Sequence, residues 1–218
     1  MTLAEYTALL LLGIAVSFTP GPNTALSATM GAQGGLKSAL PFVIGVPFGW
    51  GLLLTSSVLG ISAVLANVAS ARLGVAILGT GYLVWLAKRL ATAPALPADT
   101  PAAALAPTVG FKGAVALQFV NIKAWMLSFS IVAGWLSGPA ATLERFVMVL
   151  PTLMAFAFFS NLLYAWIGAA LRQWLRQGKR LKRFNQTMAG VLCVTAFWML
   201  KPYLCPTSAC VRQIGVLD

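Results

Sequence analysis

Charged residues are widely spaced along the chain and leave long, uncharged apolar stretches between them. A helix needs about 20 apolar residues to cross the hydrocarbon core of a bilayer, which is roughly 30 Å thick. Cutting the sequence at its charges gives six stretches of about this length, the sixth at the short limit. We predict six transmembrane helices, over residues 3–30, 39–63, 69–89, 112–137, 146–171 and 184–200.

The composition supports an all-α polytopic membrane protein. Hydrophobic residues make up 59% of the 218-residue chain and charged residues 9%, with a mean hydropathy of +0.86. A soluble domain carries about 25% charged residues. The sequence has no histidine, and its only acids are Glu5, Asp99, Glu144 and Asp218. Histidine-based catalysis, paired-carboxylate chemistry and ordinary zinc sites are therefore nearly excluded, and we expect no metal and no cofactor.

The distribution of the cations predicts an orientation in the membrane. A net charge of +11 would favour nucleic acid in a soluble protein. Among apolar spans, such cations instead mark the cytoplasmic face and contact anionic lipid, so we expect membrane lipid and no nucleic acid as partners. Most Lys and Arg residues follow predicted helices one, three and five, which places both termini outside the cell.

The segment 94–110 differs from the rest of the chain, because its proline- and alanine-rich sequence disfavours a continuous helix. We predict a cytoplasmic linker there, between a first three-helix repeat (1–93) and a second (111–204). With three helices in each half, the second half enters from the opposite side, which makes an inverted-topology repeat. In the external tail (205–218), Cys205 and Cys210 are compatible with a disulfide or with two free thiols.

The first predicted helix contains a sequence that a continuous helix cannot accommodate. Two prolines remove amide donors and clash with the preceding turn, and the glycine between them adds backbone freedom. A break inside a membrane survives where protein or water satisfies the freed groups, so it indicates a substrate site. The alternative is that the prolines end the helix at the interface. The motif is Thr19-Pro20-Gly21-Pro22-Asn23.

Three polar residues, Gln118, Asn121 and Lys123, lie within six positions of the otherwise apolar fourth helix. A lysine facing lipid would cost about 2.5–3.5 kcal/mol at the helix centre, so we expect Lys123 to face the interior. There it would meet a substrate carboxylate or titrate during transport. Snorkelling to the cytoplasmic face is the alternative, but that face is about eleven residues away.

Weaker signals lie in other predicted helices. Asn161 and Tyr164 of the fifth helix either line the cavity or bond neighbouring backbone. The pairs Gly31 with Gly35 and Gly45 with Gly49 favour close helix packing over dimerisation. The sequence leaves the oligomeric state open, a homo-oligomer included.

Four motifs in order along the chain resemble the LysE/RhtB family of amino-acid exporters. This sequence departs from the family at 122, where Ile replaces the proline of the usual Asn-Pro-Lys-Ala. The resemblance implies a bacterial inner-membrane exporter of amino acids or their derivatives that is driven by the proton gradient. The segment 116–121 is most similar to the branch that exports cysteine and O-acetylserine. The motifs are Phe18 to Asn23, Gly31 to Gly35, Leu78 to Ala87 and Gln118 to Ala124.

We therefore predict a secondary transporter for a small amino-acid substrate. Its carboxylate would meet Lys123 and the helix-start amides after Pro22. Its ammonium would meet carbonyls freed by the break, or the side chains of Asn23, Asn121 and Gln118. A small-solute channel and a membrane-embedded enzyme are the alternatives. The enzyme is the weaker, because Cys193 and Ser130 lack an activating histidine or intramembrane acid.

Overall fold

The computed structural model describes residues 1–61, 69–93, 109–136, 142–175, 177 and 179–204. Within these ranges every regular element is a helix, as the sequence predicts. The predicted linker (94–110) lies outside these ranges except for residues 109 and 110. The predicted Cys205–Cys210 pair lies wholly outside them. The elements are α1 (Leu3–Phe18), α2 (Pro22–Gly34), α3 (Leu36–Ser56), η1 (Ser57–Ile61), α5 (Ala69–Ala91), α6 (Phe111–Val120), α7 (Ile122–Ile131), η3 (Val132–Leu136), α8 (Thr142–Ala170), α9 (Arg172–Leu175) and α10 (Arg180–Leu204).

Three helical stretches are long and apolar enough to cross a membrane, and they run over Leu36–Gly60, Leu73–Ala91 and Leu143–Ala170. Two further stretches are long and apolar enough if each bent pair of helices is counted as one span. These are α1 with α2, bent by 52°, and α6 with α7 and η3, bent by 70°. The described residues thus hold up to five candidate spans. The sixth predicted helix forms as α10, which is not among these candidates.

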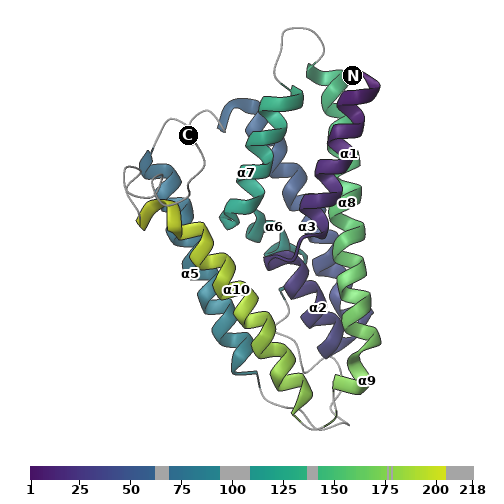
Figure 1. Cartoon of the computed structure of the whole chain (residues 1–218), viewed down its shortest axis with the longest axis vertical. Helices are drawn as coiled ribbons and strands as arrows, with labels where there is room; N and C mark the ends of the chain where they lie inside the picture. Colours follow the sequence, from purple (N-terminus) through teal and green to yellow (C-terminus); the bar gives the residue numbers. More distant parts are fainter. Residues whose placement is uncertain (62–68, 94–108, 137–141, 176, 178, 205–218) are drawn as a thin grey trace, which may run out of the picture.

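The helices occupy an elongated bundle whose two bent pairs meet near the middle of its long axis (Figure 1). Helices α2, α3, α6 and α8 pack together at the centre, and α5 pairs along its length with α10 at one side. Helix α3 begins at Leu36, three residues before the predicted start at residue 39. It follows a turn at Gly35, where φ is +80°. Positive φ is a conformation that glycine adopts without strain.

The apolar core consists of two clusters that meet at the helix breaks. One joins α2, α3, α5, α6 and α10 through residues such as Phe42 and Leu117. The other joins α1, α3, α7 and α8 through residues such as Leu9 and Leu153. Each bent pair therefore leaves one cluster and enters the other at its break. The breaks lie between two packed apolar regions that hold them in place.

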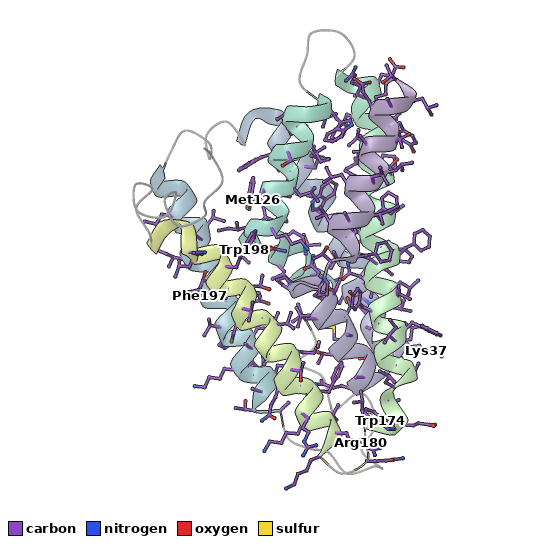
Figure 2. All side chains as sticks on the ribbon, in the orientation of Figure 1. Lys37, Met126, Trp174, Arg180, Phe197 and Trp198 are labelled. Atoms are coloured by element: carbon purple, nitrogen blue, oxygen red, sulfur yellow. The ribbon has the colours of Figure 1, made fainter. Side chains whose placement is uncertain are left out.

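Large apolar side chains also cover the outside of the bundle, as contact with lipid requires. Phe197 and Trp198 on α10 are 66% and 56% exposed, and Met126 on α7 is 51% exposed. Figure 2 places Lys37, Trp174 and Arg180 toward the end of the bundle away from the N-terminus. The guanidinium of Arg180 stacks over the Trp174 ring at 4.5 Å. The aromatic and cationic boundary chemistry typical of a membrane interface is thus present at that end.

Glycines allow the central helices to approach closely. A Cβ on Gly31 of α2 would lie 2.0 Å from the carbonyl oxygen of Ala165, and one on Gly168 of α8 would lie 2.0 Å from that of Ala28. Each helix thus presents a glycine to the other's backbone. On α3, Gly45 and Gly49 face the α6 backbone in the same way. The packing interpretation is confirmed for these positions, whereas Gly35 serves as the turn.

The α2–α8 crossing should not tolerate a single added methyl group. We expect Gly31→Ala to lower the thermal unfolding midpoint of the detergent-solubilised protein, because the backbones must separate at a cost of about 1–3 kcal/mol. The control is Gly190→Ala on α10, where an added Cβ meets nothing within 4 Å. Equal midpoints for the two variants would show that the crossing does not need the glycine.

Candidate functional site

Two helix breaks lie against each other in the middle of the bundle. The first separates α1 from α2 at residues 19–21, and the second separates α6 from α7 at Asn121. Asn121 adopts an extended conformation (φ −92°, ψ 100°), and its side-chain oxygen accepts the Lys123 amide at 3.1 Å. This is an ordinary helix cap. The second break therefore forms without a proline at position 122, which is Ile here.

The prolines at the first break explain which carbonyls need new partners. In a continuous helix the carbonyls of Val16 and Phe18 would accept the amides of residues 20 and 22, but both of these are prolines. The Lys123 ammonium donates to the Val16 carbonyl at 3.1 Å. The Tyr164 hydroxyl donates to the Phe18 carbonyl at 3.0 Å. Two side chains thus replace the two donors that the prolines remove.

The second break is completed in a similar way. The indole of Trp125 donates to the Phe119 carbonyl at 2.8 Å, close to the end of α6. The side-chain amide of Gln118 donates to the Ala114 carbonyl at 3.0 Å within the same helix. Buried backbone groups at both breaks therefore find partners in side chains, as a low-dielectric interior demands.

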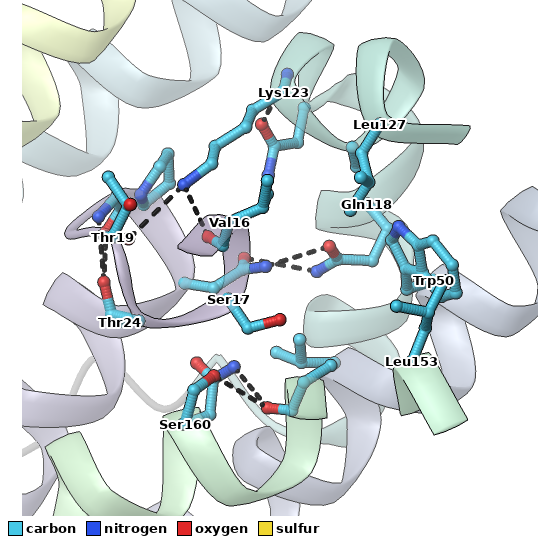
Figure 3. Close-up of a pocket in the computed structure, with 18 residues that line it drawn as sticks. Val16, Ser17, Thr19, Thr24, Trp50, Gln118, Lys123, Leu127, Leu153 and Ser160 are labelled. Atoms are coloured by element: carbon cyan, nitrogen blue, oxygen red, sulfur yellow. Dashed lines mark hydrogen bonds between the residues drawn. The ribbon is translucent and has the colours of Figure 1, made fainter. Parts of the chain in front are cut away.

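The two breaks are also linked to each other in a reciprocal manner. Lys123, at the start of α7, reaches the carbonyl end of α1 and donates to Thr19 at 3.3 Å as well as to Val16 (Figure 3). Asn23, at the start of α2, reaches the end of α6 and exchanges two hydrogen bonds with Gln118, at 3.0 and 3.2 Å. Thus α7 binds the end of α1 through Lys123, and α2 binds the end of α6 through Asn23.

A cavity of about 70 Å³ lies between the breaks, bounded by α1, α2, α3, α6, α7 and α8. One ordered water needs roughly 10–15 Å³ on this measure, so the space suits several atoms of a small polar ligand. Among the described residues that line it, Lys123 is the only charged one, and none carries a carboxylate. The predicted site residues that line the cavity are Thr19, Gly21, Pro22, Asn23, Gln118, Asn121, Lys123 and Asn161.

Two predicted residues lie outside the cavity lining. Pro20 acts through the backbone, because it has no amide hydrogen to donate. Tyr164 donates to the Phe18 carbonyl, so of its two predicted roles it has the one of bonding neighbouring backbone. Asn161 combines both roles, because it lines the cavity, accepts from Ser27 at 2.9 Å and donates to Ala157 at 2.7 Å. Gly21 is extended (φ −166°), a conformation that other residues also adopt, so its backbone alone does not require glycine.

Sequence reasoning missed several residues of the lining, notably Ser17, Trp50 and Ser160. The Trp50 indole nitrogen is buried and has no hydrogen-bond partner among the described residues. A donor of this kind is available to a bound ligand. The sequence does carry a signal, because Trp50 stands between two glycines in the middle of a span rather than at an interface, where tryptophan is common.

The geometry suits a small ligand with an anionic group. Lys123 supplies positive charge, the Trp50 indole supplies a neutral donor, and the start of α2 presents the positive end of a helix dipole. The side-chain hydroxyl of Thr24 accepts the Gly21 amide at 2.8 Å and so fixes the first turn of α2. The cavity therefore combines a fixed anion-favouring side with backbone carbonyls that favour a cation.

The Asn23–Gln118 pair should contribute measurably to folding. A double-mutant cycle of Asn23→Ala and Gln118→Ala is expected to give a coupling of about 1–2 kcal/mol in the free energy of unfolding, because either single change leaves the other amide without its partner. The control cycle joins Asn23→Ala with Gln33→Ala at the far end of α2, where Gln33 donates to Asn185 at 3.2 Å. Equal coupling in the two cycles would contradict the geometry.

Comparison with known proteins places the chain in a family. The model of the LysE type translocator family matches residues 14–200. Cysteine/O-acetylserine efflux proteins of Escherichia coli K12 and Shigella sonnei are each 27% identical to this chain over 178 residues, which cover 81% of this chain and 89% of the relative. No solved structure matches the chain significantly. Since the family match spans both breaks and the whole cavity, the chain is a membrane transporter rather than an enzyme and belongs to the LysE type translocator family.

Proposed function

We propose that this protein exports small amino acids or their derivatives from the cytoplasm, across the bacterial inner membrane, driven by the proton gradient. The observation that carries the proposal is a single cation, Lys123, in a cavity between two helix breaks. The relatives named as cysteine/O-acetylserine efflux proteins support a substrate of this class. The small cavity volume favours short side chains such as those of cysteine and O-acetylserine.

The substrate carboxylate is placed between Lys123 and the start of α2. Asn23 and Thr24 belong to the first turn of α2 and line the cavity, and first-turn amides have no acceptor within their own helix. A carboxylate there gains from the helix dipole and from the lysine charge. Charge-assisted hydrogen bonds of this kind are worth about 1.5–3 kcal/mol each, enough to select an anion in a buried site.

We propose a topology of six spans in two inverted repeats, 1–93 and 111–204, joined by a linker over 94–110. The helix contacts support it: α3 packs on α8 and α5 on α10, so two helices of each half meet their own counterparts, which is compatible with a two-fold relation. The reciprocal bonds of Lys123 and Asn23 follow the same relation. The end that carries Lys37 and Arg180 would face the cytoplasm, with both termini outside.

The proposal is tested by uptake into inside-out membrane vesicles, where export appears as accumulation. A labelled panel of cysteine, O-acetylserine, threonine, homoserine, leucine and lysine is supplied with and without a proton gradient. We expect saturable uptake of the small members that collapses with an uncoupler. Uptake that does not saturate would indicate a channel. No uptake of any member into vesicles that contain the protein would overturn the proposed substrate class.

Lys123 should be essential for this transport. We expect Lys123→Ala to lower the initial rate by about 10- to 100-fold, the factor that corresponds to loss of one charge-assisted bond. The matched control is Lys112→Ala, which removes an exposed lysine from the start of α6 in the same bent pair. Normal export by Lys123→Ala at normal abundance would remove this lysine from the mechanism.

A further inference from the structure

The carbonyl end of α1 has the character of a cation site, and the protein fills it with its own side chain. Lys123 Nζ lies 3.1 Å from the Val16 carbonyl oxygen and 3.3 Å from that of Thr19 (Figure 3). The end of a helix carries about half a negative charge, and Pro20 removes the amide that would satisfy Val16. These two carbonyls, which we call the α1 cradle, therefore need a donor, and a positive donor suits them best.

No other charge in the described part of the chain competes for the α1 cradle. The remaining charged residues on the helices that bound the cavity lie near the far ends of their helices. Helices α2 and α7 carry no further charge. The ammonium of Lys123 is thus held by neutral carbonyls alone, with no carboxylate to fix it there. The distant charges on α1, α3, α6 and α8 are Glu5, Lys37, Lys112, Glu144 and Arg145.

The α1 cradle opens onto the same cavity as the anion-favouring start of α2. Val16 and Thr19 both line the cavity, as do Gly21 and Asn23. An ideal Cβ on Gly21 would lie 3.5 Å from Lys123 Nζ, so the lysine ammonium rests beside the residue that begins α2. An α-amino acid carries its ammonium and carboxylate on one carbon atom, which suits two sites of opposite preference placed this close together.

Resting on the function proposed above, we propose that the α1 cradle is the receptor for the substrate's primary ammonium, and that Lys123 occupies it only until substrate arrives. Two ammonium groups cannot share one pair of carbonyls, so the substrate ammonium displaces that of Lys123. The freed Lys123 side chain keeps its proton and turns to the substrate carboxylate. The exchange needs no acidic residue in the cavity, and it requires a ligand with both a free primary amine and a carboxylate.

The site itself is tested with a surrogate for the lysine side chain. In purified Lys123→Ala, n-propylammonium supplies the three carbons and the ammonium that the variant lacks. We expect it to raise the unfolding midpoint by several degrees and to saturate, with no saturable effect on wild type or on Lys112→Ala. Neither n-propanol nor tetramethylammonium should reproduce the shift, because one lacks the charge and the other the N–H donors. Absence of the shift, or an equal shift in wild type, would overturn the proposal.

A second measurement uses the wild-type protein and so does not depend on the folding of a variant. Cysteine and N-acetylcysteine are compared as competitors of labelled substrate in inside-out vesicles, under reducing conditions. We expect the N-acetyl compound, which keeps the carboxylate but loses the ammonium, to compete at least tenfold less well. Equal competition would overturn the cradle even if export itself is confirmed. A propylammonium site in purified Lys123→Ala, together with wild-type vesicles that export no amino acid, would instead support the cradle and reject the proposed function.

Discussion

The structure depends on one constraint, which is that backbone groups freed inside an apolar bundle must find partners within the protein. In water, a helix broken at Pro20 and Pro22 would bond its loose carbonyls to solvent. In hydrocarbon each unsatisfied group costs several kcal/mol. The chain meets this constraint with side chains from distant segments, including Lys123 for Val16 and Tyr164 for Phe18. The break is therefore stable only because the second half of the chain comes to it.

The cavity follows from the same constraint. The Lys123–Val16 and Asn23–Gln118 bonds each join one break to the other, so the two breaks must lie in contact, and the bends of 52° and 70° leave space between them. Glycine crossings such as that of Gly31 with Gly168 bring the surrounding backbones together and restrict how far this space can collapse. The polar cavity and its lysine are thus a consequence of how the two interrupted helices are stabilised. The same polar groups would serve to bind substrate, so no additional polar site is needed.

Much of this arrangement could be predicted from the sequence, because charge spacing and proline placement act locally. The spans up to α8 and the break at residues 19–21 follow from composition and backbone chemistry alone. The interior position of Lys123 follows from the cost of exposing it to lipid, and the lining of the cavity confirms it. The break at Asn121 was harder to predict, since an asparagine cap leaves a weaker signal than a proline.

The partners of the predicted residues could not be derived from sequence, because they depend on which helix faces which. The sequence around Tyr164 does not indicate that its hydroxyl donates to the Phe18 carbonyl rather than lining the cavity. The sequence around Trp50 likewise does not indicate that its indole nitrogen has no hydrogen-bond partner among the described residues. The sixth predicted span forms as the helix α10, which is not among the candidate spans of the described residues.

Hydrogen exchange of the purified transporter tests directly whether the paired breaks form one binding site. Amide exchange is followed by mass spectrometry with and without a saturating transported amino acid. If they do, we expect slower exchange concentrated in two segments, 16–24 and 118–125, which are almost a hundred residues apart in sequence but joined by the Asn23–Gln118 and Lys123–Val16 bonds. Protection confined to other segments, such as the basic end near Arg180, would contradict it.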